Sequence, residues 1–433
     1  MLRSPYDREI LALAVPALGA LAAEPLYLLT DTAIVGHLGT PELAALALAA
    51  TLLSTLVSLC IFLTYGTTAM VARLHGAGEV ERAGAYAAQA LWLALAVGVV
   101  LTTLLVAFAP PAIALLGGEG EVAELAERYV RISAFGVPFA LIALAGQGYL
   151  RGVSQLTLPL IVVGAGNAVN VVLELLFVYG FDWGMDGSAA GTVIAQAGMG
   201  AAFVWLLLRA PAQTRRPRAD LLRPMLRTGG DLIVRTAALT GSFLVASAVI
   251  ARFGAASLGA HQIAFQLFVF LALVLDAIAI AGQVLVGRML GAGDADRAFA
   301  AARRMIEVSI AVGVVLALAL LALTDLVPRA FTGDEDVVAR AHEIWPLFAL
   351  MQPLGAAVFA LDGILIGAGD TRYLALSMLA AGFGAYVPVA LLSLAFDWGI
   401  LGVWCGLILL MVVRLATLAV RFRGRRWAVV GAA

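Results

Sequence analysis

Long apolar runs, separated by short polar and glycine-rich stretches, recur from one end of the chain to the other. Each run reaches about 20 residues or more, the length that an α-helix needs to cross a bilayer. None shows the alternation of a membrane β-barrel strand, so the pattern predicts helices. We expect twelve membrane spans, at residues 10–36, 42–72, 84–110, 125–150, 156–180, 187–209, 228–251, 258–288, 299–326, 337–367, 371–396 and 399–421.

The sequence also repeats itself at an offset of 215 residues. FDWG occurs at 181–184 and again at 396–399, and ARLHGAGEVERA (72–83) aligns with GRMLGAGDADRA (287–298). This self-match predicts two copies of one six-helix unit. Six spans return the chain to its starting side, so the copies form parallel repeats, as in many secondary transporters. The expected domains are an N-terminal lobe at 1–209, a cytoplasmic linker at 210–227 and a C-terminal lobe at 228–433.

Composition and charge place the chain in a membrane. Hydrophobic residues make up 63% and charged residues 13%, whereas soluble domains carry about 25% charged residues. All 27 basic residues are arginine, and twenty of them fall on one side of the predicted spans. The positive-inside rule puts that side, with both termini, in the cytoplasm. We therefore expect a multi-pass protein of a bacterial or archaeal inner (plasma) membrane, whose first span is retained rather than cleaved.

Other kinds of site find little support in the sequence. Cys60 and Cys405 both fall within spans, and the four histidines are scattered, so we expect no metal site and no enzymatic centre. The GAGE and GAGD strings at 76–79, 291–294 and 367–370 lack the context of a phosphate-binding loop and predict tight turns at helix ends. We expect no cofactor and no nucleic-acid partner. If the chain is a transporter, the lack of a nucleotide-binding loop means that an ion gradient, rather than ATP, must drive transport.

Polar side chains within the spans mark the candidate site, because an acid in hydrocarbon is costly. Two spans carry such residues at positions i, i+3 and i+7, on one helix face. The first set is Glu24, Tyr27 and Asp31; the second is Asn167, Asn170 and Glu174; and span six adds Thr192. These faces can converge on one cavity, which is the predicted site.

The repeat provides an internal control for this site. At the same offset Asp31 corresponds to Ala246 and Glu174 to Val389. A purely architectural role would be expected in both halves, so a chemical task explains the asymmetry better. The alternative is a set of helix–helix hydrogen bonds, worth about 0.6 kcal/mol each. It stays open for Asn167 and Asn170, and Glu24 could instead bond a backbone donor freed beside Pro25.

Further polar residues extend the candidate site into the C-terminal half. Asp276 and Gln266, both in span eight, are candidates for the substrate cavity. Asp362 is a second acid within a span, and Arg235 and Arg414 are the bases that could neutralise such acids.

Two prolines, Pro16 and Pro25, interrupt the hydrogen-bond ladder of span one. They produce either a fixed bend or a hinge that moves Asp31.

Several segments resemble the multidrug and toxic compound extrusion (MATE) family. They are PLYLLTDTAIVGHLG (25–39), GAGEVERA (76–83), NVVLELLFVYG (170–180) and LDGILIGAGDTR (361–372). The resemblance extends over essentially the whole chain and is strongest to the prokaryotic branch named for a DNA-damage-inducible protein. It implies a V-shaped pair of six-helix lobes that exports organic cations in exchange for protons or sodium.

The resemblance also assigns roles to residues. The family's ion-coupling positions fall on Asp31, Asn170, Glu174 and Thr192, and its kink proline falls on Pro16. Many relatives have aspartate where this chain has Glu174, whose carboxylate reaches one methylene further. This departure puts sodium coordination in doubt more than proton binding, so the proton is the favoured coupling ion and sodium at the same residues is the alternative.

These observations together predict a monomeric secondary antiporter that exports lipophilic organic cations by alternating access. Proton and cation would compete for the same carboxylates. One alternative is a lipid-linked oligosaccharide flippase of the same superfamily, which would need arginine in its cavity. The other is an intramembrane enzyme, which would need a nucleophile or a metal cluster.

Overall fold

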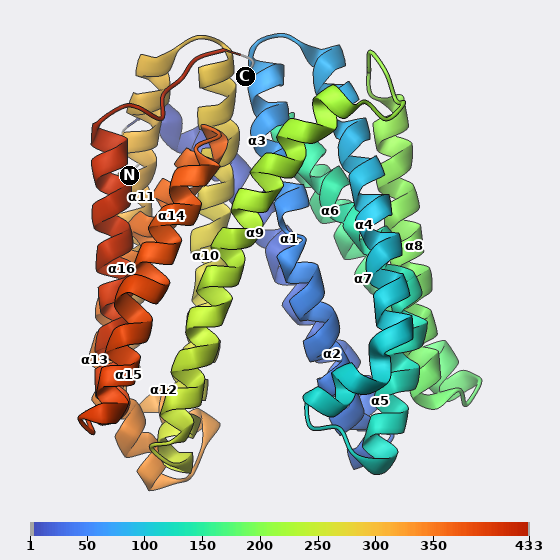
Figure 1. Cartoon of the computed structure of the whole chain (residues 1–433), viewed down its shortest axis with the longest axis vertical. Coiled ribbons are helices and arrows are strands. Elements are labelled where there is room, and N and C mark those ends of the chain that lie inside the picture. Colours follow the sequence, from blue (N-terminus) through green and yellow to red (C-terminus); the bar gives the residue numbers. More distant parts are fainter. Residues whose placement is uncertain (1–3, 432–433) are drawn as a thin grey trace. The chain divides into compact units, whose positions relative to one another are not determined.

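A computed structural model describes residues 4–431, which form helices and connecting turns without a strand. The first half holds six long apolar helical segments, several of them divided in two (Figure 1). Their helices are α1 (Pro5–Gly36), α2 (Thr40–Leu59), α3 (Phe62–Gly76), α4 (Val80–Leu115), α5 (Gly120–Ser133), α6 (Val137–Gly152), α7 (Thr157–Leu175) and α8 (Gly184–Arg209). A π-helical turn at Leu176–Gly180 extends α7.

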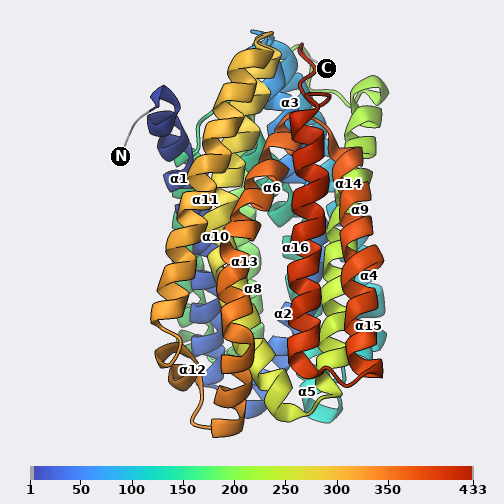
Figure 2. The same cartoon turned by 90° about the vertical axis from the view of Figure 1, so that its left-hand side faces the viewer.

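The second half holds six further segments of this kind, and Figure 2 shows α11, α13 and α16 of this half side by side. The helices are α9 (Ala219–Ala251), α10 (Ala255–Gly291), α11 (Ala295–Ala322), α12 (Leu326–Phe331), α13 (Glu335–Gly367), α14 (Thr371–Ala381), α15 (Val387–Ala395) and α16 (Gly399–Arg423). A π-helical turn at Gly382–Tyr386 joins α14 to α15. The twelve predicted spans, and the all-α membrane fold, are confirmed.

The repeated FDWG string forms the same turn in both halves. Asp182 and Asp397 have φ of 54° and 55°, and Gly184 and Gly399 have φ of 55° and 63°. These left-handed conformations suit glycine and are tolerated by aspartate better than by most residues. The duplicated sequence therefore reverses the chain in the same way before α8 and before α16.

The glycine-rich strings end helices, as their sequences predict. The second glycine of each has a positive φ: 78° at Gly78, 84° at Gly293 and 78° at Gly369. The amide of Glu79 donates to the carbonyl of Leu74, which closes the end of α3. These features are typical of left-handed caps at helix C-termini.

Paired glycines allow close helix crossings at equivalent places in the two halves. A β-carbon at Gly148 of α6 would lie 2.8 Å from the carbonyl oxygen of Thr64, and one at Gly363 of α13 would lie 2.1 Å from that of Ala279. Gly148 corresponds to Gly363, and Thr64 to Ala279, at the 215-residue offset. Small residues at such crossings let helix backbones approach closely in membrane proteins. The repeat thus preserves the packing of α6 on α3 and of α13 on α10.

The repeat is less regular elsewhere. The second span is divided into α2 and α3 at Cys60–Ile61, whereas its counterpart α10 is a single helix. In α4 the backbone at Phe108 leaves the helical region, with φ −113° and ψ 16°. Pro110 and Pro111 lie two and three residues further on, and proline is a usual cause of such a kink.

The compact units of the structure differ from the predicted domains at their edges. One unit comprises Gly19–Gly229, and the other comprises Gly230–Gly431 together with the chain up to Leu18. The first turns of α1 belong to the C-terminal unit, and their acids pair with arginines of that unit. Asp7 accepts hydrogen bonds from Arg304 at 2.7 and 3.0 Å, and Glu9 pairs with Arg288.

The predicted linker also differs, since α9 begins at Ala219, within it. Its first part lies on α4: the amide of Gln89 donates to the carbonyl of Arg216 at 3.0 Å, and the indole of Trp92 donates to that of Arg215 at 2.8 Å.

Candidate functional site

Two acidic side chains meet inside the unit formed by Gly19–Gly229. Asp31 of α1 and Glu174 of α7 are 2% and 0% exposed. Their carboxyl groups interact directly with one another. Both spans carry these acids on the face predicted from their i, i+3, i+7 spacing. The structure therefore places the two acids in one cluster.

Hydroxyl and amide groups surround the acid pair. Ser188 of α8 donates to Asp31 Oδ1 at 2.8 Å, and Thr192 Oγ1 lies 3.1 Å from the hydroxyl of Tyr27 and 3.4 Å from Glu174 Oε1. In the orientation that satisfies its neighbours, the Asn170 amide donates to Glu174 Oε1 at 2.7 Å and accepts from the backbone amide of Thr192 at 3.1 Å. Helices α1, α7 and α8 thus all contribute to one polar network.

Two members of this network were not among the predicted site residues. Ser188 lies one turn before Thr192 on α8, so its spacing offered a signal that could have found it. The side chain of Tyr129, on α5, is 3% exposed and interacts with Asp31, Ser188 and Thr192. Its role depends on where α5 packs, and its sequence position carries no such signal.

A cavity of about 260 Å³ lies against this network. The acids Glu24 and Asp31 line it together with Tyr27, Asn167, Asn170 and Thr192. Aliphatic side chains such as Leu53, Val57 and Val137 form much of the remaining wall. A largely apolar pocket with a few converging polar groups is the usual form of a small-molecule site.

Hydrogen bonds from α7 to the backbone of α1 hold the two helices together beside the cavity. The Asn167 amide donates to the carbonyl of Ala23 at 2.9 Å, and the Tyr179 hydroxyl donates to that of Ile34 at 2.6 Å. Asn167 thus ties helices together while also lining the cavity. Pro16 and Pro25 both lie within the helical bounds of α1, and Pro16 lies close to Leu18, where α1 passes from one unit to the other. The hinge role of Pro16 stays a prediction.

The predicted cavity residues of the C-terminal half lie elsewhere. Asp276 and Gln266 are both on α10, in the other unit, and neither lines this cavity. Asp276 is partly buried and Gln266 is exposed. Their contribution to substrate binding stays a prediction.

In the C-terminal unit, an ion cluster occupies positions equivalent to part of the cavity wall. Arg235 of α9 donates to Asp362 Oδ2 at 2.5 Å, and Arg414 of α16 pairs with the same carboxylate. At the 215-residue offset, Asp362 corresponds to Gln147 and Arg414 to Met199, which both line the cavity of the first unit. The expectation that the two arginines neutralise a buried acid is confirmed.

Comparison with known proteins identifies the family. The MatE family model matches residues 16–176 and 232–392. The chain is 32% identical to Protein DETOXIFICATION 44, chloroplastic, of Arabidopsis thaliana, over 96% of this chain and 82% of that protein. It is 28% identical to DNA damage-inducible protein F of Escherichia coli, over 97% and 93% of the two chains.

Among solved structures, a multidrug resistance MATE family transporter of the MOP superfamily in an outward-facing conformation superposes with a TM-score of 0.88. It is 20% identical and is matched over 98% of both chains. The fold, the match of the family model to both halves and the end-to-end similarity to relatives agree with the resemblance found in the sequence. This chain therefore belongs to the MATE family of membrane transporters.

Proposed function

We propose that this chain exports lipophilic organic cations in exchange for protons, and that Asp31 and Glu174 are the coupling acids. The observation that carries the proposal is the direct contact of these two buried carboxyl groups. Two carboxylates so close cannot both stay ionised in a membrane interior without a balancing positive charge. A proton or a cationic substrate would provide that charge, and competition between them would produce exchange.

The hydrogen bonds around the pair favour the proton over sodium. Glu174 Oε2 is buried and receives no hydrogen bond from any amide, hydroxyl or guanidinium group within residues 4–431. A proton on one of the two acids would supply the donor for a hydrogen bond between their carboxyl groups. Glu174 Oε1 is already bonded by Asn170 and Thr192. Sodium would need several oxygen ligands at suitable distances, whereas a proton needs only one basic oxygen.

The cavity supports a cationic rather than an anionic substrate. Its charged lining residues are the acids Glu24 and Asp31. A flippase for anionic pyrophosphate lipids would instead need basic side chains there. Arg235 and Arg414, the bases predicted within spans, belong to the other unit and pair with Asp362. The flippase alternative is therefore the weaker one.

The membrane topology is part of the same proposal. The arginine distribution favours both termini on the cytoplasmic side of an inner (plasma) membrane. Export would then carry cations from the cytoplasm outward while protons return. A single chain contains the complete acid pair and its cavity, which suits a monomer.

The test uses the purified full chain in proteoliposomes loaded with tetraphenylphosphonium. An imposed pH gradient in sodium-free buffer should drive its movement, and a protonophore should stop it. A sodium gradient at equal pH should have little effect. If tetraphenylphosphonium moves only when sodium is present and does not respond to the pH gradient, the proton assignment is wrong. If its movement responds to neither the pH gradient nor the sodium gradient, the proposal of coupled cation exchange is wrong.

A further inference from the structure

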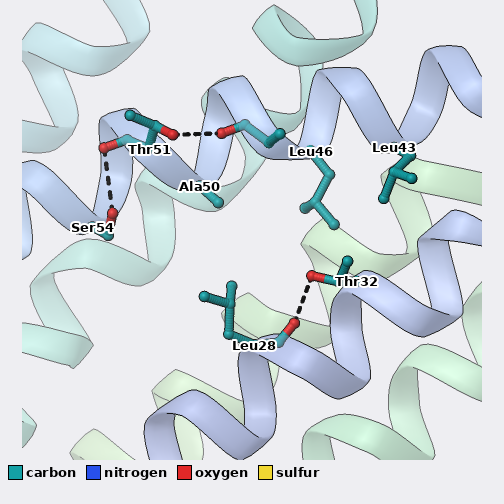
Figure 3. A pocket seen from close by; sticks show the side chains of 8 residues that line it. Leu28, Thr32, Leu43, Leu46, Ala50, Thr51 and Ser54 are labelled. Carbon is teal, nitrogen blue, oxygen red and sulfur yellow. Dashed lines mark hydrogen bonds between the residues drawn. The ribbon is translucent and has the colours of Figure 1, made fainter. Parts of the chain in front are cut away.

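A second pocket, of about 310 Å³, lies between α1 and α2 of the same unit. Figure 3 shows Leu28 and Thr32 of α1 facing Leu46 and Ala50 of α2 across it. Leu43, toward the start of α2, also lines the pocket, and Thr51 lines it further along the helix. None of its lining side chains is charged. Neither the acid pair nor its hydrogen-bonded neighbours belong to this pocket, so the site already described does not explain it.

The two pockets are adjacent and share part of their walls. Leu28, Ala50 and Ser54 line both of them. On α1, Leu28 follows Tyr27 and is therefore rotated by about 100° from it around the helix axis. Leu28 thus stands between the polar face of α1, which holds Asp31, and the face of Thr32. Leu28, Ala50 and Ser54 therefore form the boundary that a ligand extending from the acids into the second pocket would contact.

The hydroxyl groups of the second pocket are already hydrogen-bonded to their own helices. Thr32 donates to the carbonyl of Leu28 at 2.7 Å, Thr51 to that of Ala47 at 2.7 Å, and Ser54 to that of Thr51 at 3.3 Å (Figure 3). Their donors are occupied, so these residues present methyl groups, methylenes and oxygen lone pairs. With the leucines and alanines they form a surface suited to hydrocarbon or an aromatic ring rather than to a charge.

We propose that this pocket binds the apolar tail of an amphipathic organic cation whose charged group lies at the acids of the neighbouring cavity. The inference rests on the proposed function and specifies the substrate class. Thr32 lies eight positions after Glu24, which corresponds to about 12 Å along α1. A cation with a flexible chain or a ring system extending up to that distance from its charge fits both compartments. The acids select the charge, and the α1–α2 pocket selects the tail.

The test measures binding of n-alkyltrimethylammonium ions, from butyl to decyl, to the full chain in nanodiscs. Isothermal titration calorimetry is used, with the heat of empty nanodiscs subtracted. Each methylene that enters the pocket should tighten binding about fourfold, until the pocket is full. Ala47 lines the α1–α2 pocket but not the cavity beside the acids. The Ala47→Phe substitution should therefore fill the α1–α2 pocket with a phenyl ring. This variant should lose the chain-length dependence and keep the affinity for the butyl ion.

Two further variants make the result specific. Ala44→Phe is the matched control, because Ala44 is exposed on the same helix and lines neither pocket; it should behave as the wild type. Leu43→Ala enlarges the second pocket, and binding should then continue to tighten at chain lengths where the wild type has levelled off. Its result decides the matter should Ala47→Phe fail to fold.

Several outcomes would overturn the inference. A chain-length dependence that survives in Ala47→Phe, or that is unchanged in Leu43→Ala, places the tail elsewhere. If decanol binds as tightly as the decyl cation, and Ala47→Phe weakens both equally, the pocket is a site for lipid chains. The proposed function fails separately, if the butyl ion binds the wild type and the Asp31→Asn variant equally well.

Discussion

At the residue scale, Asp31 and Glu174 place two buried acidic groups against each other within the predicted membrane spans. Ser188 donates to the first, and Asn170 and Thr192 bond the second. These neighbours fix both carboxyl groups in position without contributing positive charge. On the function proposed above, the pair would change its charge by taking up a proton, while the polar network around it stays in place.

The Asp31→Asn variant tests this arrangement most directly. Asparagine keeps the shape of the side chain and an oxygen that can accept from Ser188, so the protein should insert and fold. It removes the charge that a proton and a cationic substrate would share. We expect gradient-driven export of tetraphenylphosphonium from proteoliposomes to fall at least tenfold.

Asp186→Asn is the control for this prediction, because Asp186 pairs with Arg128 rather than with the acid pair and does not line the cavity. A half-exposed ion pair of this kind is worth at most about 1 kcal/mol, so export should be nearly unchanged. Full export by a well-folded Asp31→Asn protein would show that the cluster is architectural.

Part of this site could be predicted from the sequence. The i, i+3, i+7 spacing put the acids on defined helix faces, and their absence from the second repeat separated them from the scaffold. Tyr129 could not be found in this way, since its contact with Asp31 arises from the packing of α5 beside α8. The pocket between α1 and α2 depends on side-chain volumes that no periodicity records.

At the scale of the helices, the glycines of α6 and α13 determine how closely neighbouring helices approach. A β-carbon at Gly363 would lie 2.1 Å from the carbonyl oxygen of Ala279 on α10. A backbone atom cannot turn aside as a flexible side chain can. Any added methyl group must therefore push α13 away from α10.

Gly363→Ala should destabilise the protein by about 1–3 kcal/mol or more, as overpacking of a tight interior does. The matched control is Gly355→Ala on the same helix, where a β-carbon meets no atom within 4 Å. Alanine there should be neutral or stabilise α13 by up to about 1 kcal/mol, through its better helix propensity. Thermal unfolding of both variants in detergent measures the difference, and equal midpoints would contradict the close-crossing argument.

The element boundaries show where the sequence pattern loses its predictive value. Hydropathy gave the spans, and FDWG and the glycine-rich strings gave the turns, because those features act locally. The division of the second span at Cys60–Ile61 has no proline or glycine to announce it. The assignment of the first turns of α1 to the C-terminal unit depends on Asp7 and Arg304, which lie 297 residues apart.

At the scale of the whole molecule, the two halves share a scaffold but differ in what fills it. The first unit has a cavity with an acid pair. In the second unit Asp362 is bonded by Arg235 and Arg414, and Asp362 and Arg414 occupy the positions equivalent to the cavity-lining Gln147 and Met199. If Asp362 took up a proton, Arg235 and the buried Arg414 would lose their counter-charge, which is strongly unfavourable. We therefore propose that protons bind and leave in the first unit.

This asymmetry predicts different effects for two acids of different halves. Glu174→Gln should abolish or shift the pH dependence of proton release on substrate addition, because it removes one of the two paired acids. Asp276 has no acidic counterpart, since its repeat partner is Ile61. Asp276→Asn should change the apparent affinity for some substrates and leave that pH dependence nearly unchanged.

Proton release on addition of tetraphenylphosphonium, followed across pH for both purified variants, distinguishes the two halves. Unfolding midpoints close to that of the wild type provide the control for folding. A substitution that merely weakens substrate binding should lose its effect at saturating substrate, whereas one that removes a coupling acid should not. If Asp276→Asn abolishes release at saturation while Glu174→Gln retains it, coupling belongs to the C-terminal half, and the missing acids at Ala246 and Val389 say nothing about where protons bind.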